Sequence, residues 1–249
     1  MSDINKICWN IISKCNKNCS YCFRFYEDCL SYKENEKILD NIHKMGVKEI
    51  VWSGGEPFLY KDIVKLLKKS KELGIYNSLI TNGSLINEAN IQKYLKYIDK
   101  LIMSLDFIDD KKNEEYGIGK YYYKHLSTVL SLSKKIKKDI IIQVNTVVFN
   151  GNYKHIKDLM LELNKYNIDN WKAIRFMPIR GKALTNKMNL SITDNQFNEM
   201  LRIVDNIEPN YNIIISDNKD SLKTHYIVLS SGKLIKSIDG DDIFIKSLL

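Results

Sequence analysis

The segment Ile140-Ile-Ile-Gln-Val-Asn-Thr-Val-Val148 is apolar at most positions, with no regular polar alternation. A strand whose two faces are both buried, as in a parallel sheet covered by helices, has this near-continuous apolar character. A strand with one face in water would alternate apolar and polar residues instead. The segment therefore predicts a buried strand of a parallel α/β sheet.

Strands and helices alternate on both sides of this segment. The other predicted strands are short apolar runs, at 7–13, 49–53, 75–81, 101–105 and 171–177. Between them, apolar residues recur at the i, i+3, i+4 spacing of amphipathic helices. The polar stretch 106–120 predicts a loop, and Thr193 with Gln196 predicts a capping box at the start of the last helix.

The number of strand–helix units limits the architecture. Six units of about 33 residues each, a normal size for a strand with its crossover helix, occupy residues 7–206. The rest of the chain is too short for two more units, which a closed eight-unit barrel of about 250 residues needs. We predict a partial (β/α)6 TIM barrel over 1–206, with a C-terminal extension, 207–249, that packs on it and contains short strands.

Composition and charge leave several partner classes open. The 249-residue chain has 38 basic and 30 acidic residues, a net charge of +8, which suits an anionic substrate or nucleic acid. Only four of the 38 are Arg, and an AT-rich coding sequence also produces a Lys- and Asn-rich chain. No apolar run reaches about 18 residues, and Met1–Lys6 lacks the pattern of a secretory signal. We expect no membrane partner and a cytoplasmic location.

All five cysteines lie within the first 29 residues, where they suit a metal or iron–sulfur site better than a disulfide framework. The run Cys15-Asn-Lys-Asn-Cys19-Ser-Tyr-Cys22 has the spacing C-x3-C-x2-C. Three thiolates at such short spacing can hold three corners of an iron–sulfur cubane and leave one iron open. Zinc is the alternative, with Cys19 and Cys22 as half a site completed by Cys8, Cys15 or Cys29.

This spacing, with an aromatic residue directly before the last cysteine, resembles that of the radical S-adenosylmethionine (SAM) enzymes. The resemblance implies that Cys15, Cys19 and Cys22 bind a [4Fe–4S] cluster whose fourth iron SAM chelates, and that Tyr21 lies beside the SAM adenine. It also implies an electron donor such as flavodoxin or ferredoxin, because one electron must cleave SAM into methionine and a 5′-deoxyadenosyl radical. The cofactor then carries the difficult chemistry.

The second predicted strand ends in Ser53-Gly-Gly-Glu-Pro57, which matches the GGEP element of the same family. Two glycines let backbone approach a ligand without a clash at Cβ. The Glu56 carboxylate either holds a ligand ammonium or fixes the loop. By the resemblance, Gly54, Gly55 and Glu56 bind the methionine end of SAM.

Polar residues also follow other strands, at the end where parallel α/β folds place their sites. They are Asn82, Ser104 and Asn145. In the family, these levels hold the SAM ribose and carboxylate, or the substrate, although Ser and Asn also serve as strand caps. We expect Asn82 and Ser104 to bind cofactor and Asn145 to bind substrate.

A closer resemblance is to viperin and its prokaryotic relatives, which dehydrate a nucleoside triphosphate, typically CTP. The shared stretches are Cys19–Phe23, Trp52–Leu59, Ser104–Asp106, Tyr116-Gly-Ile-Gly-Lys120, Asn145–Val148, Trp171-Lys172 and Tyr226–Leu229. The resemblance implies that Asn145 and Lys172 contact the nucleotide and that Lys120 binds phosphate. It makes Tyr226 the candidate hydrogen donor to a substrate radical.

Two positions depart from that pattern: Gln143 stands where we expect Lys, and Asn170 where we expect Arg. Arg175 and Arg180 are the candidates to replace the lost cations, because an Arg fork suits phosphate. Lys172 and Arg175 have opposite parity along one strand, so one of them faces the helices.

Three alternatives remain at this level. A radical SAM enzyme of this size can modify a peptide or rearrange another small molecule. A nucleic-acid-binding α/β protein with a structural metal would use the positive charge and the 15 tyrosines for stacking. Most Tyr and Lys residues are instead scattered through amphipathic helices, so we do not expect a nucleic-acid partner.

Overall fold

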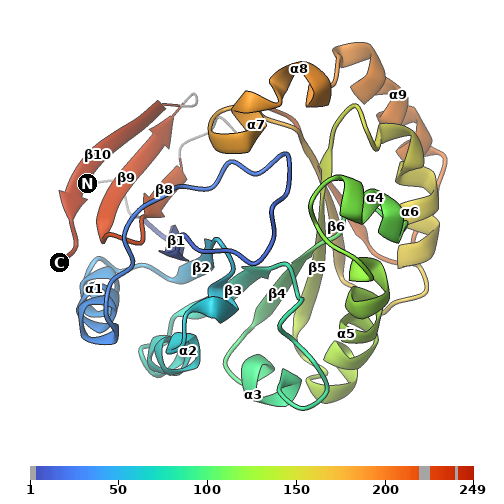
Figure 1. The fold of residues 1–249 in the computed structure, drawn as a ribbon. Coiled ribbons are helices and arrows are strands. Elements are labelled where there is room, and N and C mark those ends of the chain that lie inside the picture. The colour runs from blue at the N-terminus through green and yellow to red at the C-terminus, as the bar shows by residue number, and fades with distance from the viewer. Residues whose placement is uncertain (1–3, 219–224, 239–240) are drawn as a thin grey trace.

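The structure is a computed structural model that describes residues 4–218, 225–238 and 241–249. Its described strands form one sheet in the order β10-β9-β8-β1-β2-β3-β4-β5-β6-β7. From β1 to β7, each strand pairs parallel with the next one in the chain. In Figure 1 this part of the sheet curves around the centre of the view, with the helices outside it. The predicted mixed α/β class with a parallel sheet is confirmed.

The strands span β1 Lys6–Ile12, β2 Glu49–Gly54, β3 Tyr76–Thr81, β4 Lys100–Ser104, β5 Ile141–Val148, β6 Asn170–Arg175, β7 Asn212–Ser216, β8 His225–Val228, β9 Lys233–Ile238 and β10 Asp241–Ser247. The α-helices span α1 Tyr32–Lys44, α2 Ile63–Glu72, α3 Ile91–Leu95, α4 Asp110–Glu115, α5 Tyr122–Ile136, α6 Ile156–Leu163, α7 Gly181–Thr185, α8 Lys187–Leu190 and α9 Asp194–Asp205. Short 3-10 helices cover Pro57–Leu59 and Tyr153–His155. All six predicted barrel strands are present, and the Thr193–Gln196 capping box starts α9 as expected.

One segment differs from the sequence expectation. The predicted loop 106–120 contains α4, whose N-cap Asp109 accepts a hydrogen bond from the Lys111 amide. Its sequence, Asp-Lys-Lys-Asn-Glu-Glu, has no apolar stripe, so periodicity gave no signal. The short strands expected after 206 are present, and they extend both edges of the sheet. Strand β7 pairs parallel with β6, while β8 pairs parallel with β1 and continues into the antiparallel strands β9 and β10.

The two faces of the sheet have different chemistry. The face toward the helices is apolar, and its largest fully buried side chains include Trp9, Trp52 and Trp171. On β1 and β2, the first two of these stack with ring centroids 4.9 Å apart. The opposite face, which we call the inward face, holds polar side chains at alternate positions, including Asn10 paired with Ser53. The curved sheet therefore has a polar lining, which suits a ligand site better than a packed apolar centre.

No helix in the described part of the chain is both long enough and apolar enough to span a membrane.

The buried side chain of Asn77 on β3 cross-links three parts of the fold. Its Oδ1 accepts hydrogen bonds from Trp52 and Ser70, and its Nδ2 donates to the carbonyls of Leu67 and Tyr97 at 2.9 and 2.8 Å. Asn77→Asp leaves both carbonyls without a donor and buries a carboxylate, so the free energy of unfolding should fall by at least about 3 kcal/mol. Chemical denaturation measures this, with the exposed Asn189→Asp as the control that stays near wild type.

Candidate functional site

The three motif cysteines lie on the connection from β1 to α1, residues 13–31, which we call the cysteine loop. It leaves the carboxyl end of β1 and crosses the same edge of the sheet where β2, β3 and β4 end (Figure 1). Cys15, Cys19 and Cys22 are half-buried free thiols. Sites in parallel α/β folds occupy this edge.

The glycines at the end of β2 pack directly against the start of the cysteine loop. Gly55 N–H donates to the Ile12 carbonyl at 2.6 Å, and Glu56 N–H donates to the Lys14 carbonyl at 2.9 Å. A Cβ on Gly55 would lie 2.0 Å from the Lys14 oxygen, and one on Gly54 would lie 2.3 Å from the Ile12 oxygen. Glycine is thus required at these two positions because they lie against the backbone of residues 12–14, beside Cys15.

Glu56 fixes this corner of the site. Its carboxylate is fully buried and accepts hydrogen bonds from the Thr81 hydroxyl at 2.8 Å, the Asn82 amide at 2.9 Å and the Phe58 amide at 3.1 Å. Burial raises its pKa, and the three donors act in the opposite direction. The sequence left two roles open for Glu56: binding a ligand ammonium or fixing the loop. The three hydrogen bonds within the chain support the second role.

Asn82 extends the same corner to the cysteines. Its Nδ2 donates to Asn16 Oδ1 at 3.0 Å and lies 3.8 Å from the Cys15 sulfur. The predicted cofactor residue therefore lies beside the first motif cysteine, at the end of β3.

The opposite side of the cysteine loop rests on residues 116–120. Asn18 N–H donates to the Gly117 carbonyl at 2.9 Å, and Ser20 N–H donates to the Tyr116 carbonyl at 3.0 Å. Gly117 has φ 76°, and a Cβ there would lie 2.4 Å from the Asn18 oxygen. This glycine-rich segment thus supports the cysteine loop.

Lys120, at the end of this segment, has a side chain that is 68% exposed and pairs with Glu114 at 3.3 Å. A surface ion pair of this kind is weak enough to give way to a phosphate.

Tyr21 anchors the middle of the cysteine loop in the core. Its hydroxyl donates to Asp106 Oδ2 at 2.5 Å, and the Val147 amide donates to Asp106 Oδ1 at 2.6 Å. The ring packs on Phe149 with centroids 5.3 Å apart. Burial raises the pKa of Asp106 to about 6, and the two hydrogen bonds counteract this. The Tyr21 side chain is therefore held by β4 and β5 rather than turned toward an open pocket.

Two cations lie beside the cysteines. Burial raises the pKa of the Cys15 thiol, while the positive charge of Arg24 acts in the opposite direction. Burial also raises the pKa of Cys19 to about 12, with the negative charges of Asp106 and of the other two thiols adding to the effect. The Lys17 ammonium is half-buried near Cys19, Cys15 and Glu56. Without a metal the Cys15 and Cys19 thiols stay protonated, so metal binding must release their protons.

The donor set and charges fit an iron–sulfur cluster. Three thiols sit at short spacing, and Arg24 has a buried Nε with no hydrogen-bond partner among the described residues. A thiolate-ligated cluster is an electron-rich group that Lys17 and Arg24 can neutralise. Within those same residues, no three His, Cys, Asp or Glu side chains form a close group of the kind that holds a single metal ion.

A row of polar residues crosses the inward face next to the cysteine loop. Strand register pairs Ser104 of β4 with Asn145 of β5, and Asn145 with Lys172 of β6. Register partners in a parallel sheet point to the same face, so the three side chains are neighbours. Gln143 lies two residues earlier on β5, on the same face, and donates from Nε2 to Asn145 Oδ1 at 2.7 Å. The expected cofactor and substrate residues at these strand ends thus come together.

Arg175 does not belong to this row, and its assignment to the substrate is corrected. Its side chain lies on the helix face of β6, where it pairs with Asp194 at 2.6 Å and Asp217 at 3.2 Å and stacks on Phe197. The parity argument therefore leaves Lys172 as the inward cation. Arg180, the other replacement candidate, pairs with Asp242 of β10 at 2.5 Å.

The structure does not bring Tyr226 to the inward face either. Register pairs Ile227 with Cys8 and Val228 with Trp9, so Tyr226 shares the face of Val228 and Trp9. The hydrogen-donor role of Tyr226 stays a prediction that this arrangement does not support.

Sequence reasoning missed Asp106, Lys17 and Arg24 as site residues. Asp106 directly follows the apolar strand predicted over 101–105, and a carboxylate at the end of a buried strand itself indicates a functional site. Lys17 lies inside the cysteine motif and Arg24 lies two residues after it, and only the cysteines of this stretch were assigned a role.

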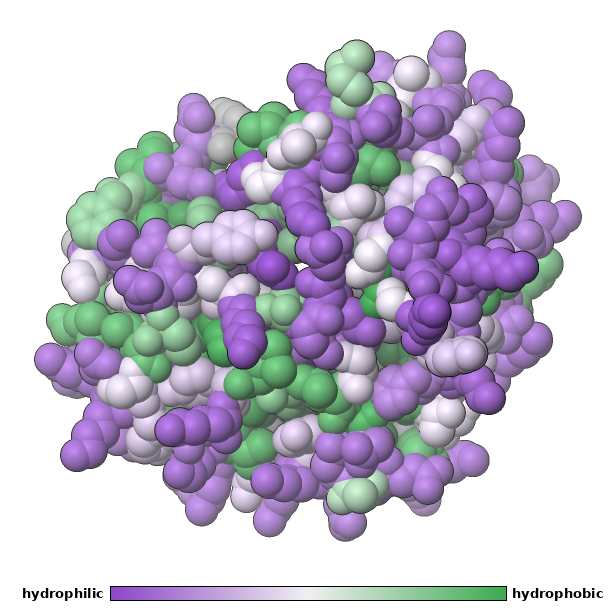
Figure 2. Space-filling view, viewed as in Figure 1, coloured by the Kyte–Doolittle hydropathy of each residue, from purple (hydrophilic) through white to green (hydrophobic). Residues whose placement is uncertain are grey.

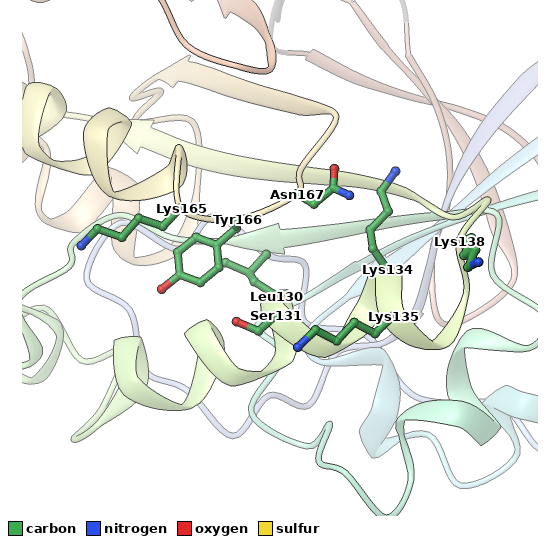
Figure 3. Close-up of a pocket in the computed structure, with 8 residues that line it drawn as sticks. All are labelled: Leu130, Ser131, Lys134, Lys135, Lys138, Lys165, Tyr166 and Asn167. Atoms are coloured by element: carbon green, nitrogen blue, oxygen red, sulfur yellow. The ribbon is translucent and has the colours of Figure 1, made fainter.

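A separate hollow, with a volume of about 680 Å³, lies away from this site (Figure 3). Its lining comes from the C-terminal half of α5, from Lys138 after that helix, and from residues 165–167, which precede β6. It includes Lys134, Lys135, Lys138 and Lys165. Two of these lysines are paired, with Asp169 and Glu162. This hollow is at the amino end of the strands and is no part of the cysteine site.

Comparison with protein families gives a match to the family model described as Radical SAM superfamily, over residues 9–163. The match includes the three motif cysteines, the Gly54–Glu56 corner and the ends of β3 to β5.

Among curated proteins, the chain is 26% identical over 269 aligned residues to an S-adenosylmethionine-dependent nucleotide dehydratase of Lacinutrix mariniflava, covering 100% of this chain and 54% of that protein. It is 25% identical to a protein of the same description from Flammeovirga pacifica, with 99% of this chain and 87% of that protein aligned. The chain thus spans about half the length of the first relative.

A solved structure of similar fold is that of SuiB from Streptococcus suis bound to S-adenosylmethionine. It superposes with a TM-score of 0.74 at 20% identity, covering 92% of this chain and 59% of SuiB. At this identity the likeness concerns the fold.

A side chain at Gly55 should disturb cluster loading. Gly55→Ala places a Cβ against the Lys14 carbonyl, which must shift and displace Cys15, so iron and sulfide content after anaerobic reconstitution should fall to less than half. Gly46→Ala is the matched control: φ 78° strains it, but a Cβ there meets nothing within 4 Å. Full iron content in Gly55→Ala at wild-type stability would contradict this role.

Loss of the Tyr21 hydroxyl should destabilise the protein in a pH-dependent way. The hydroxyl stabilises the ionised form of Asp106, whose folded-state pKa is about 6. In Tyr21→Phe that pKa rises further, so the loss, about 1–3 kcal/mol of unfolding free energy, is largest above pH 6 and shrinks below it. Denaturation of the metal-free protein from pH 5 to 8 measures it, with the exposed Tyr121→Phe as control; a loss independent of pH would argue against the pairing.

Proposed function

The chain belongs to the radical SAM superfamily, and we propose that it removes water from a nucleoside triphosphate by hydrogen abstraction. The observation that carries the proposal is the polar row Ser104, Asn145 and Lys172, which the strand register aligns beside the cysteine loop. Both curated relatives described above are called nucleotide dehydratases, which supports this substrate class.

The cysteine loop supplies the cofactor end of the site. By the resemblance to the family, Cys15, Cys19 and Cys22 would hold a [4Fe–4S] cluster through their thiolates. When bound, the cluster would supply the electron for the reductive cleavage of SAM that precedes hydrogen abstraction from the substrate. Lys17 and Arg24 hold positive charge next to the thiolates. The Gly54–Glu56 corner and Asn82 border Cys15. Glu56 fixes this corner, and we propose that the glycine backbone and Asn82 bind the methionine end of SAM there.

The polar row supplies the substrate end. Lys172 places one cation on the inward face for phosphate, and a charge-assisted contact of this kind is stronger than a neutral one. Because Gln143 donates to Asn145 Oδ1, the Asn145 amide N–H groups remain to donate to a nucleotide oxygen. Ser104 borders the cofactor side of the row. Two residues after Ser104, Asp106 accepts the Tyr21 hydroxyl, and two residues after Asn145, the Val147 amide donates to Asp106. The row and the cysteine loop therefore share one rigid support.

We also propose that the parallel strands form the partial (β/α)6 TIM barrel expected from the sequence, with 207–249 as its extension. The sequential order β1 to β6 and the curvature in Figure 1 support this. The five free cysteines suit a cytoplasmic location, where thiols stay reduced.

The proposal is tested by incubating the reconstituted protein anaerobically with SAM, dithionite and each of CTP, UTP, GTP and ATP. One nucleotide should raise 5′-deoxyadenosine formation above the uncoupled background. If none does and a short peptide does, the enzyme is a peptide-modifying one instead.

Lys172→Ala should weaken binding of that nucleotide about tenfold or more, because a charged hydrogen bond is worth roughly 1.5–3 kcal/mol. Arg175→Ala is the matched control, since it removes the same charge from the opposite face of the same strand and should lower stability while leaving nucleotide affinity unchanged. Equilibrium binding measures both. Equal losses in the two variants would mean that net charge, and not the inward position, sets affinity.

A further inference from the structure

The helices α7 and α8 lie directly on the cysteine loop. Ala183 N–H donates to the carbonyl of Cys22 at 3.1 Å, and the Asn186 side chain donates to the carbonyl of Ser20 at 2.8 Å. A Cβ on Gly181 would lie 3.8 Å from the Cα of Phe23. One hydrogen bond therefore separates the backbone of α7 from that of a cluster ligand.

The outer side of these helices exposes apolar side chains. Met188 is 92% exposed and Leu184 is 52% exposed, and Phe23 of the neighbouring cysteine loop is also exposed. We call this surface, with Lys187, the α7–α8 face. In Figure 2, a hydrophobic group stands over α8 at the top of the view among hydrophilic side chains. Methionine and aromatic residues of this kind are enriched at the centres of protein interfaces.

The two chain segments that form this face carry charge of one sign. Neither residues 8–26 nor residues 170–193 contain any Asp or Glu, although the whole chain has 30. Apart from Lys172 and Arg175 on β6, the cations of these two segments are Lys14, Lys17, Arg24, Arg180, Lys182 and Lys187. The Lys17 ammonium lies over the Tyr122 ring of α5, away from the face. Arg180 is neutralised by Asp242. A surface with an apolar centre and a positive border fits a partner with an acidic surface.

We propose that the α7–α8 face docks a small acidic one-electron carrier protein that reduces the cluster. The inference rests on the proposed function, because only that function requires an electron at the cysteines. In the step, the carrier loses one electron and the cluster gains one, and no atom is transferred. The peptide bond from Phe23 to Cys22 and the hydrogen bond from Ala183 to Cys22 both give short routes from this surface to a ligand of the cluster.

The other lysine-rich surface does not serve this role. The hollow of Figure 3 is also basic, but it lies at the amino end of β5 and β6, opposite the edge that carries the cysteine loop. A carrier bound there would be separated from the cysteines by the length of the sheet. Its lysines are therefore useful as controls for net charge.

The test compares two pairs of substitutions in the reconstituted enzyme with flavodoxin as the probe. Lys187→Glu and Met188→Glu change the α7–α8 face. Lys135→Glu and Ser131→Glu make the same changes of charge at exposed positions around the remote hollow. Binding of oxidised flavodoxin is measured by anaerobic calorimetry at two salt concentrations. The rate of cluster reduction by reduced flavodoxin is measured by stopped-flow absorbance, and SAM cleavage is measured separately with dithionite.

Each variant of the α7–α8 face should bind flavodoxin ~tenfold more weakly and be reduced by it correspondingly more slowly, with the salt dependence lower in Lys187→Glu. Both control variants should behave as wild type. Cluster absorbance and dithionite-driven SAM cleavage should be unchanged in all four. Wild-type flavodoxin binding by the α7–α8 variants, or equal losses in the control pair, overturns the docking surface. Absence of dithionite-driven SAM cleavage in the wild type overturns the proposed function instead.

Discussion

The site depends on one contact, the approach of the Gly54-Gly55 backbone to the end of β1. Gly55 N–H reaches the Ile12 carbonyl at 2.6 Å, and no side chain fits between the two strands' ends. This contact sets the direction in which the chain leaves β1 and hence where Cys15 lies. The same corner orders the Glu56 carboxylate, which joins the ends of β2 and β3. One steric constraint thus places the first thiol and the adjoining ligand-binding residues together.

Beyond this contact, several different elements of the fold hold the cysteine loop in place. Tyr21 is tied to Asp106 after β4, Asn18 and Ser20 to residues 116–117, and Cys22 to α7. None of these contacts is strong alone, since an ordinary hydrogen bond contributes about 1 kcal/mol. Together they fix a loop that has no helix or strand of its own, which is what a preorganised cluster site requires.

The sequence predicted the repeated pattern well and the individual side-chain directions less well. Six strands and the α9 capping box followed from apolar runs and a Thr-x-x-Gln signature, because period and capping chemistry are local. Helix α4 was missed because its stability comes from Asp109 and charged pairs rather than an apolar stripe. Strand parity correctly separated Lys172 from Arg175, but which of the two faced inward depended on the tertiary position of Asp194 and Asp217. Asp106 gained its importance from Tyr21, 85 positions away in the chain, and no local pattern encodes such a partner.

The spread of these supports along the chain has a consequence for how the protein matures. The carbonyl of Ser20 accepts a hydrogen bond from the Asn186 side chain, which is 166 residues further along the chain. Contacts of such long range form late in folding, because the intervening chain must be ordered first. The cysteines are synthesised well before residue 186, yet the pocket around them is complete only after that residue has been made and has packed on Ser20. A metal captured by the three thiols before these supports form would compete with the correct cluster.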